Sequence, residues 1–244
     1  MATKEGIETG VTGLDTALAR PLDHRYLTTM TTLYLARHGE TEWHAEHRYA
    51  GSSDVVLTSH GRRQAAALAE WAPTAGLSAI VASPLSRARL SAEPPARAAG
   101  LPLRIEPRLV EIDFGSAEGM SPGELATTYP EEWAGFEQRP ARHPLPGGEP
   151  GVDGIARSLP VFDELAAEFP DGRVLVVGHA TLMRLQLCEL LGLDPDWYRD
   201  IFPTIEGCAL MPIELPWSGE SAWPGRARLL GVNVPPVPPM PRQA

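Results

Sequence analysis

Three short segments of this 244-residue chain place arginine or histidine beside small residues. They read Arg37-His38-Gly39-Glu40-Thr41, then Ser83-Pro84-Leu85-Ser86-Arg87-Ala88, then Gly178-His179-Ala180. An arginine offers a planar fork of N–H donors that matches phosphate or carboxylate oxygens, and two arginines can neutralise a dianionic phosphoryl group. A histidine with an ordinary pKa of about 6.5 stays neutral enough at pH 7 to attack phosphorus, while a second one donates to the phosphoryl oxygens. The set therefore indicates phosphoryl transfer without a metal.

Each of these segments directly follows a predicted β-strand. The strands are expected at 33–36, 79–82 and 173–178, and the last is a continuous valine and leucine run typical of a strand buried on both faces. Helical patterns and further short strands alternate along the rest of the chain: helices at 59–71, 86–99, 121–137, 152–169 and 181–191, and strands at 103–105, 207–213 and 227–232. This order predicts an α/β fold, a three-layer sandwich with a mostly parallel central sheet flanked by helices. Because parallel strands end at one sheet edge, we expect the arginines and histidines to meet there.

Glycines and helix starts adjoin the reactive side chains. Gly39 and Gly178 are expected to let the main chain approach a ligand closely. The amides of the helices that follow Ser83 and His179 are expected to point at an anion. Pro160 is expected either to kink its helix or to mark its true beginning.

Composition narrows the classes of protein that fit. The formal net charge of −10 argues against binding nucleic acid or an anionic membrane through a basic surface. No apolar run approaches the roughly 20 residues that span a bilayer, and the first 30 residues lack a continuous apolar segment typical of a signal peptide. Cys188 and Cys208 both lie in apolar sequence, where buried, reduced cysteines are the usual reading. We expect a cytoplasmic protein with neither nucleic acid nor membrane among its partners.

The chain divides into three parts by composition. Residues 1–31 are polar and are expected to form a flexible N-terminal extension. Residues 32–232 carry the alternating strands and helices and are expected to form a single domain. Residues 233–244 are rich in proline, which lacks the amide donor that helices and central strands need, so an extended C-terminal tail is expected.

The motifs, taken in order, resemble the histidine phosphatase superfamily, whose fold is called phosphoglycerate mutase-like. The resemblance covers residues 32–232 and rests on these residues: Arg37 to Trp43; Leu57-Thr58 with Gly61 and Gln64; Ser83-Pro84-Leu85 with Arg87-Ala88; Glu111-Ile112 with Phe114-Gly115 and Glu118-Gly119; Gly147-Gly148-Glu149; and Gly178-His179-Ala180. An ordered set of this length is far more specific than any one motif. It implies a phosphoric monoester hydrolase.

The resemblance assigns a role to each matching residue. It implies that His38 is the nucleophile and becomes phosphohistidine, and that Arg37, Arg87 and His179 complete the phosphate pocket. It implies that Glu111 protonates the leaving oxygen and then helps to activate water. A carboxyl in that role must be held protonated, so its pKa should be raised by burial or by the nearby phosphate. No cofactor is implied; the expected partner is a small phosphorylated metabolite, and a homodimer fits the family.

Other residues are expected to contact the substrate beyond its phosphate. Trp43, His44 and Ser53 lie in the loop region 43–53, and Ala180 follows the second histidine. His44 stands where the family commonly has asparagine, and a histidine can donate a similar hydrogen bond. His44 and His47 at positions i and i+3 could suggest a metal site, but no third or fourth ligand is evident, so no metal is expected.

Two questions stay open at the level of the sequence. Asp113 and Glu118 rival Glu111 as the acid, although Asp113 is expected to face the opposite side of an extended segment. In the family, phosphatases and mutases use the same phosphohistidine. Positions 111 and 179 lie only 68 residues apart, and the resemblance implies a longer insertion there for bisphosphoglycerate-dependent mutases. A phosphomonoesterase is therefore favoured over mutase-type phosphoryl transfer and over a catalytically silent phosphate-binding module.

Overall fold

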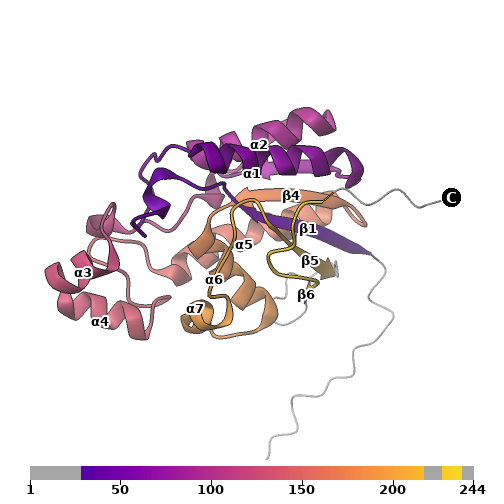
Figure 1. The fold of residues 1–244 in the computed structure, drawn as a ribbon. Helices are drawn as coiled ribbons and strands as arrows, with labels where there is room; N and C mark the ends of the chain where they lie inside the picture. The colour runs from indigo at the N-terminus through magenta and orange to yellow at the C-terminus, as the bar shows by residue number, and fades with distance from the viewer. Residues whose placement is uncertain (1–28, 217–226, 238–244) are drawn as a thin grey trace, which may run out of the picture.

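A six-stranded sheet forms the centre of the part of the chain that the structure, a computed structural model, describes: residues 29–216 and 227–237 (Figure 1). The strand order is β3-β2-β4-β1-β5-β6. The strands are β1 (Met30–Arg37), β2 (Ala79–Ala82), β3 (Leu103–Ile105), β4 (Arg173–Gly178), β5 (Leu210–Pro216) and β6 (Arg228–Leu229). The first four are mutually parallel, whereas β5 runs antiparallel to β1 and β6 antiparallel to β5. The predicted mostly parallel sheet is confirmed.

Helices cover both faces of this sheet. Helices α1 (Ser59–Trp71) and α2 (Ser86–Ala99) lie on one face, and α5 (Gly151–Glu168) and α6 (Ala180–Leu191) lie on the other (Figure 1). The alternation of side chains along β4 divides the core accordingly: Leu175 and Val177 pack with α1 and α2, and Val174 and Val176 pack with α5 and α6. The predicted three-layer sandwich is confirmed.

The segment between β3 and α5 differs from the single helix predicted at 121–137. Two helices form there, α3 (Pro122–Thr128) and α4 (Pro130–Gln138). Tyr129 separates them with φ −132° and ψ 61°, because the ring of Pro130 disfavours helical geometry in the residue before it. Figure 1 places both helices, with the short α7 (Tyr198–Ile201), beyond the end of the sheet where β1 and β4 finish.

Several element ends also differ from the predictions. Strand β1 begins at Met30 instead of residue 33, since the Met30 amide donates to Asp171 and the Thr31 hydroxyl donates to two carbonyls near the end of α5. Strand β5 begins at Leu210 instead of residue 207, because Cys208 has a left-handed backbone (φ 58°) that turns the chain there. Helix α5 starts at Gly151 and continues past Pro160, so Pro160 is not its beginning.

The described ends of the chain bear on the predicted organisation. Residues 1–28 of the predicted extension (1–31) and residues 238–244 of the predicted tail (233–244) lie outside the described residues, and Met30 and Thr31 belong to β1. On the other side of the domain, Val234 exchanges two main-chain hydrogen bonds with Leu210, at 2.8 and 2.9 Å, so the first residues of the proline-rich segment pair with the sheet. Within 29–216 and 227–237, no helix has the length and apolarity needed to cross a membrane.

Candidate active site

The ends of β1 and β4 bring the two histidines together. These strands are neighbours, with Arg37 opposite Gly178, and the His38 amide donates to the Gly178 carbonyl at 2.9 Å. The rings of His38 and His179 lie 5.2 Å apart between centroids, and both side chains are buried. The shared carboxyl edge of the parallel strands therefore creates the pair.

Hydrogen bonding fixes the form of the His38 ring. Its Nδ1 lies 2.8 Å from the Gly39 carbonyl oxygen, which can only accept, so Nδ1 carries the proton. Nε2 then keeps its lone pair and faces Nε of Arg87 at 3.3 Å. Burial, followed by the electrostatic influence of His179 and of the Arg37 charge, holds the pKa of His38 well below 6.5, and burial likewise holds that of His179 well below 6.5. The ring is thus a neutral, oriented nucleophile near pH 7.

Arg87 combines this contact with a structural one. Its side chain is fully buried, and its two terminal nitrogens donate to three carbonyls of the loop 50–53 at 2.7–3.0 Å, those of Ala50, Gly51 and Ser53. From the other side, the Glu118 carboxylate accepts from the amides of the same loop at 2.7–3.2 Å. Only Nε of Arg87 remains directed at His38, and Ser53, expected at the substrate, belongs to this clamped loop.

The carboxylate of Glu111 contacts the N-terminal amides of helix α6. Its carboxylate accepts from the amides of Thr181 at 2.9 Å and Leu182 at 2.8 Å, and from the amide of Ile112 at 2.9 Å. Burial raises the pKa of Glu111 above 4.5, and these amide hydrogen bonds oppose the shift. The α6 amides that were expected to point at a ligand anion point at this carboxylate instead.

Arg37 and His44 meet on the other side of the nucleophile. The Arg37 guanidinium donates from Nη1 to the Ile205 carbonyl at 2.9 Å, while Nη2 contacts Nε2 of His44. His44 Nδ1 accepts from the Thr41 amide at 2.8 Å, which leaves the Nε2 proton facing Arg37 in the neutral ring. Burial and the charge of Arg37 lower the pKa of His44 to about 4, and burial and the charge of Arg184 lower that of Arg37 to about 10.

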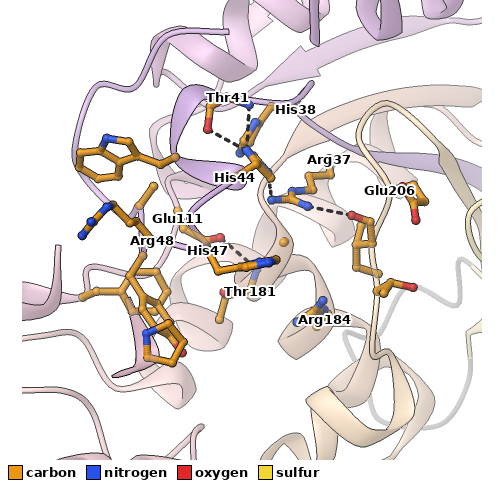
Figure 2. Close-up of a pocket in the computed structure, with 18 of the residues that line it drawn as sticks. Arg37, His38, Thr41, His44, His47, Arg48, Glu111, Thr181, Arg184 and Glu206 are labelled. Carbon is orange, nitrogen blue, oxygen red and sulfur yellow. Dashed lines mark hydrogen bonds between the residues drawn. The ribbon is translucent and has the colours of Figure 1, made fainter. Parts of the chain in front are cut away.

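A cavity of about 500 Å³ opens above these groups (Figure 2). Arg37, His38 and Glu111 contribute to its floor. Further lining residues come from three regions: Thr41, Trp43, His44, His47, Arg48, Tyr49 and Ala50 from the segment after β1; Ala180, Thr181 and Arg184 from α6; and Pro203, Thr204, Ile205 and Glu206 from the loop before β5. Phe114 and Pro122 complete it. The cavity is large enough for a small organic molecule.

A sequence model of the histidine phosphatase superfamily (branch 1) matches residues 33–216, which include every residue of the floor. The chain belongs to the histidine phosphatase superfamily. The predicted family and enzyme class are therefore confirmed.

Relatives of this histidine phosphatase include proteins named as phosphatases and as mutases. It is 35% identical over 165 residues to phosphoserine phosphatase 1 of Hydrogenobacter thermophilus, covering 68% of this chain and 78% of the relative. It is 32% identical over 202 residues to a probable phosphoglycerate mutase of Klebsiella pneumoniae, covering 80% of this chain and 90% of the relative. A mycobacterial glucosyl-3-phosphoglycerate phosphatase structure aligns with a TM-score of 0.76 at 28% identity, covering 84% of this chain and 99% of that one.

Asp113 and Glu118, the other two candidates for the general acid of this histidine phosphatase, form contacts away from the cavity. Asp113 is exposed and accepts from the Gly115 amide at 2.8 Å, and Glu118 is held by the amides of the loop 50–53. Glu111 alone among the three lines the cavity.

The requirement for glycine at position 39 comes from helix packing and not from the expected approach of a ligand. A Cβ there would lie 2.5 Å from the Gly61 carbonyl oxygen in α1, whereas a Cβ at position 178 would meet open space.

Within the described ranges, buried nitrogens without a hydrogen-bond partner include Nε of Arg37 and of Arg184, which line the cavity, and Nδ1 of His179, whose ring lies 5.2 Å from that of His38 but does not itself line the cavity. Each can act as a donor, and buried donors without acceptors are uncommon in folded proteins. The site therefore offers unused donors for an anion. Among residues 29–216 and 227–237, no group of three or more His, Cys, Asp or Glu side chains is placed to hold a metal ion.

Arg184 and Glu206 line the cavity but were not predicted as site residues. Arg184 lies four residues after Ala180 and three after Thr181 in α6, so all three side chains lie on one side of the helix. Once Ala180 is placed at the site, Arg184 is expected there too. That spacing is the signal that could have found Arg184. Glu206 follows Ile205, whose carbonyl accepts from Arg37, and the sequence gives no local sign of that contact.

Proposed function

We propose that this histidine phosphatase is a metal-independent phosphomonoesterase that hydrolyses a small organic phosphate through a phosphohistidine on His38. The observation that carries the proposal is the protonation state of His38, whose Nδ1–H is held by Gly39 while Nε2 points toward Arg87. The unpartnered donors of Arg37 and His179 support the binding of phosphoryl oxygens beside that lone pair.

The first step transfers the phosphoryl group to the enzyme. The lone pair of His38 Nε2 attacks phosphorus in line, the bond from phosphorus to the ester oxygen breaks, and that oxygen takes the proton of Glu111. Arg37 and Arg87 neutralise the charge on the three remaining phosphoryl oxygens, and Nδ1 of the neutral His179 ring donates a hydrogen bond to them. The raised pKa of Glu111 supports its role as an acid, and an approaching phosphate dianion raises that pKa further.

The second step releases inorganic phosphate. Glu111, now a carboxylate, takes a proton from a water molecule as the water oxygen attacks phosphorus. The bond from phosphorus to Nε2 breaks, and His38 regains its neutral form. Each turnover thus consumes one water and returns both side chains to their starting protonation states.

The leaving group of the proposed substrate is small. The relatives' names mention phosphoserine, phosphoglycerate and glucosyl-3-phosphoglycerate, and a cavity of about 500 Å³ suits esters of this class. A mutase-type transfer is the second candidate, because the probable phosphoglycerate mutase covers 80% of this chain. It would use the same phosphohistidine with a substrate hydroxyl as the acceptor in place of water.

Phosphate release from a panel of phosphomonoesters in EDTA tests the proposal, with wild type and His38→Ala compared at matched concentrations. We expect metal-independent turnover that falls at least about 1,000-fold in the variant, as for loss of a covalent nucleophile. Acid-labile enzyme-bound ³²P should form in wild type only. Interconversion of 2- and 3-phosphoglycerate without phosphate release would favour the mutase, and silence of wild type in both assays would contradict both.

A further inference from the structure

Arg184 is a cavity-lining cation that the phosphoryl-transfer chemistry leaves unused. It lies one turn into α6 on the face that also carries Ala180 and Thr181. Its Nη2 donates to the Pro203 carbonyl at 3.0 Å, while Nε is buried without a partner. Figure 2 shows it at the cavity below Arg37, near Thr181.

The loop before β5 holds Arg184 close to the phosphate site. Arg184 donates to the carbonyl of Pro203, and Arg37 donates to the carbonyl of Ile205, two residues further along the same loop. Both guanidinium groups line one cavity of about 500 Å³. A single small molecule can therefore contact both.

Charge balance around Arg184 also points to an anionic ligand. Within residues 29–216 and 227–237, no Asp or Glu forms an ion pair with it, whereas Arg48, Arg108 and Arg142 each have such a partner. The centroid of the Tyr198 ring lies 6.0 Å from the guanidinium carbon of Arg184. Burial and, after it, the charge of Arg184 lower the pKa of Arg37, so the two cations repel each other. An anion beside Arg184 would relieve that repulsion.

We propose that Arg184 is a specificity-determining residue that binds a second anionic group, a carboxylate or a second phosphate, on the same substrate whose phosphate ester sits at His38. This inference rests on the proposed function for the position of the ester. A guanidinium can bind either group through two parallel N–H donors. The preferred substrate is accordingly a small ester with two separated anionic ends, and esters with a neutral leaving group are poorer substrates.

Matched pairs of esters test this directly. Phosphoserine is compared with phosphoethanolamine, and 3-phosphoglycerate with glycerol 3-phosphate, since each pair differs chiefly by a carboxylate. Fructose 1,6-bisphosphate against fructose 6-phosphate tests a second phosphate. The proteins are wild type, Arg184→Met, Arg184→Lys and the control Arg97→Met, whose arginine is exposed on α2 away from the cavity. The quantity measured is the ratio of kcat/KM within each pair.

We expect wild type and Arg97→Met to prefer, in at least one pair, the ester that carries the second anionic group. Arg184→Met should lower that ratio by about 10- to 100-fold, the size of one charge-assisted hydrogen bond, with most of the change in KM, and Arg184→Lys should restore part of it. If the kcat/KM ratio depends on Arg184 only in the fructose pair, the second anion is a phosphate. If the ratio depends on Arg184 only in the other two pairs, the second anion is a carboxylate. Wild type without any preference, or a ratio unchanged in Arg184→Met, would overturn the proposal.

A binding measurement separates this proposal from the proposed function. Calorimetric titration of 3-phosphoglycerate and glycerol 3-phosphate into His38→Ala, and into the same variant carrying Arg184→Met, needs no turnover. Tighter binding of 3-phosphoglycerate that is lost with Arg184 supports the subsite even if wild type proves not to hydrolyse any ester. Equal binding of the two ligands, together with equal binding of fructose 1,6-bisphosphate and fructose 6-phosphate, contradicts the subsite even if hydrolysis through His38 is established.

Discussion

The floor of the cavity and its rim are built in different ways. On the floor, His38 and His179 follow neighbouring parallel strands, and main-chain groups orient His38 and Glu111. The rim combines the segment after β1, helix α6 and the loop before β5, and its side chains are more exposed. Main-chain support makes the floor a property of the fold, whereas the rim depends on which side chains each segment carries. The reaction and the choice of substrate can therefore change separately.

The largest effect after loss of the nucleophile should come from Glu111→Gln on the floor. We expect kcat for an alkyl phosphate to fall by about 10²- to 10⁴-fold, because the leaving alkoxide loses its proton donor. p-Nitrophenyl phosphate, whose leaving group needs no proton, should lose far less. Steady-state kinetics with both esters checks this, and a circular dichroism melt confirms that the variant folds. Equal losses on the two esters would assign Glu111 a role other than the acid.

The pH profile should follow the same carboxyl. The pKa of His38 lies well below 6.5, so its neutral form does not limit activity as pH falls from 8 to 6.5. Glu111 must be protonated, and its pKa is raised above 4.5 by burial, so kcat/KM for an alkyl phosphate should fall about tenfold per pH unit above that raised pKa. Profiles from pH 4.5 to 9 for wild type and Glu111→Gln check this, with p-nitrophenyl phosphate correcting for ionisation of the substrate. A fall that persists in Glu111→Gln must come from another group.

His44, between floor and rim, should have an intermediate effect. Its neutral ring presents Nε2–H beside Arg37, so a phosphoryl oxygen can accept from both. We expect His44→Ala to raise KM about tenfold for every ester alike, and His44→Asn to restore most of the loss, because an amide can donate from a similar place. A change in KM that differs from one leaving group to another would show that His44 contacts the leaving group and not the phosphoryl group.

The smallest effect should come from Asn233, which supports the rim from outside the cavity. Its side chain accepts from the Glu206 amide at 2.9 Å and donates to the Thr204 carbonyl at 3.1 Å. Asn233→Ala should lower kcat/KM for the preferred ester by only about threefold and destabilise the fold by about 1 kcal/mol. Kinetics and urea unfolding measure the two changes. A fall in kcat for every ester, with the preference among esters unchanged, would show that the loop before β5 also affects the catalytic groups on the floor.

Much of the fold and floor could be predicted because the signals are local. The apolar runs at β2, β3 and β4 and the helical spacing of α1 and α2 gave the observed bounds, and the reactive residues stand immediately after such runs. Tyr129 shows where periodicity is not enough, since a single proline after it divides one predicted helix into two. Arg184 was missed although its spacing from Ala180 on α6 signals its place, whereas Glu206 lies in a loop whose contact with Arg37 joins residues far apart in the sequence.

The clamp on the loop 50–53 also bears on how this enzyme can diverge. Arg87 and Glu118 hold that loop entirely through main-chain carbonyls and amides. Replacement of Ser52 or Ser53 leaves those bonds intact, whereas a side chain at Gly51 would bring a Cβ within 2.3 Å of both the Glu118 carboxylate and the Ile112 carbonyl. Lineages of this enzyme should therefore drift freely at positions 52 and 53 and stay fixed at 51, and that contrast can be read from an alignment without any assay.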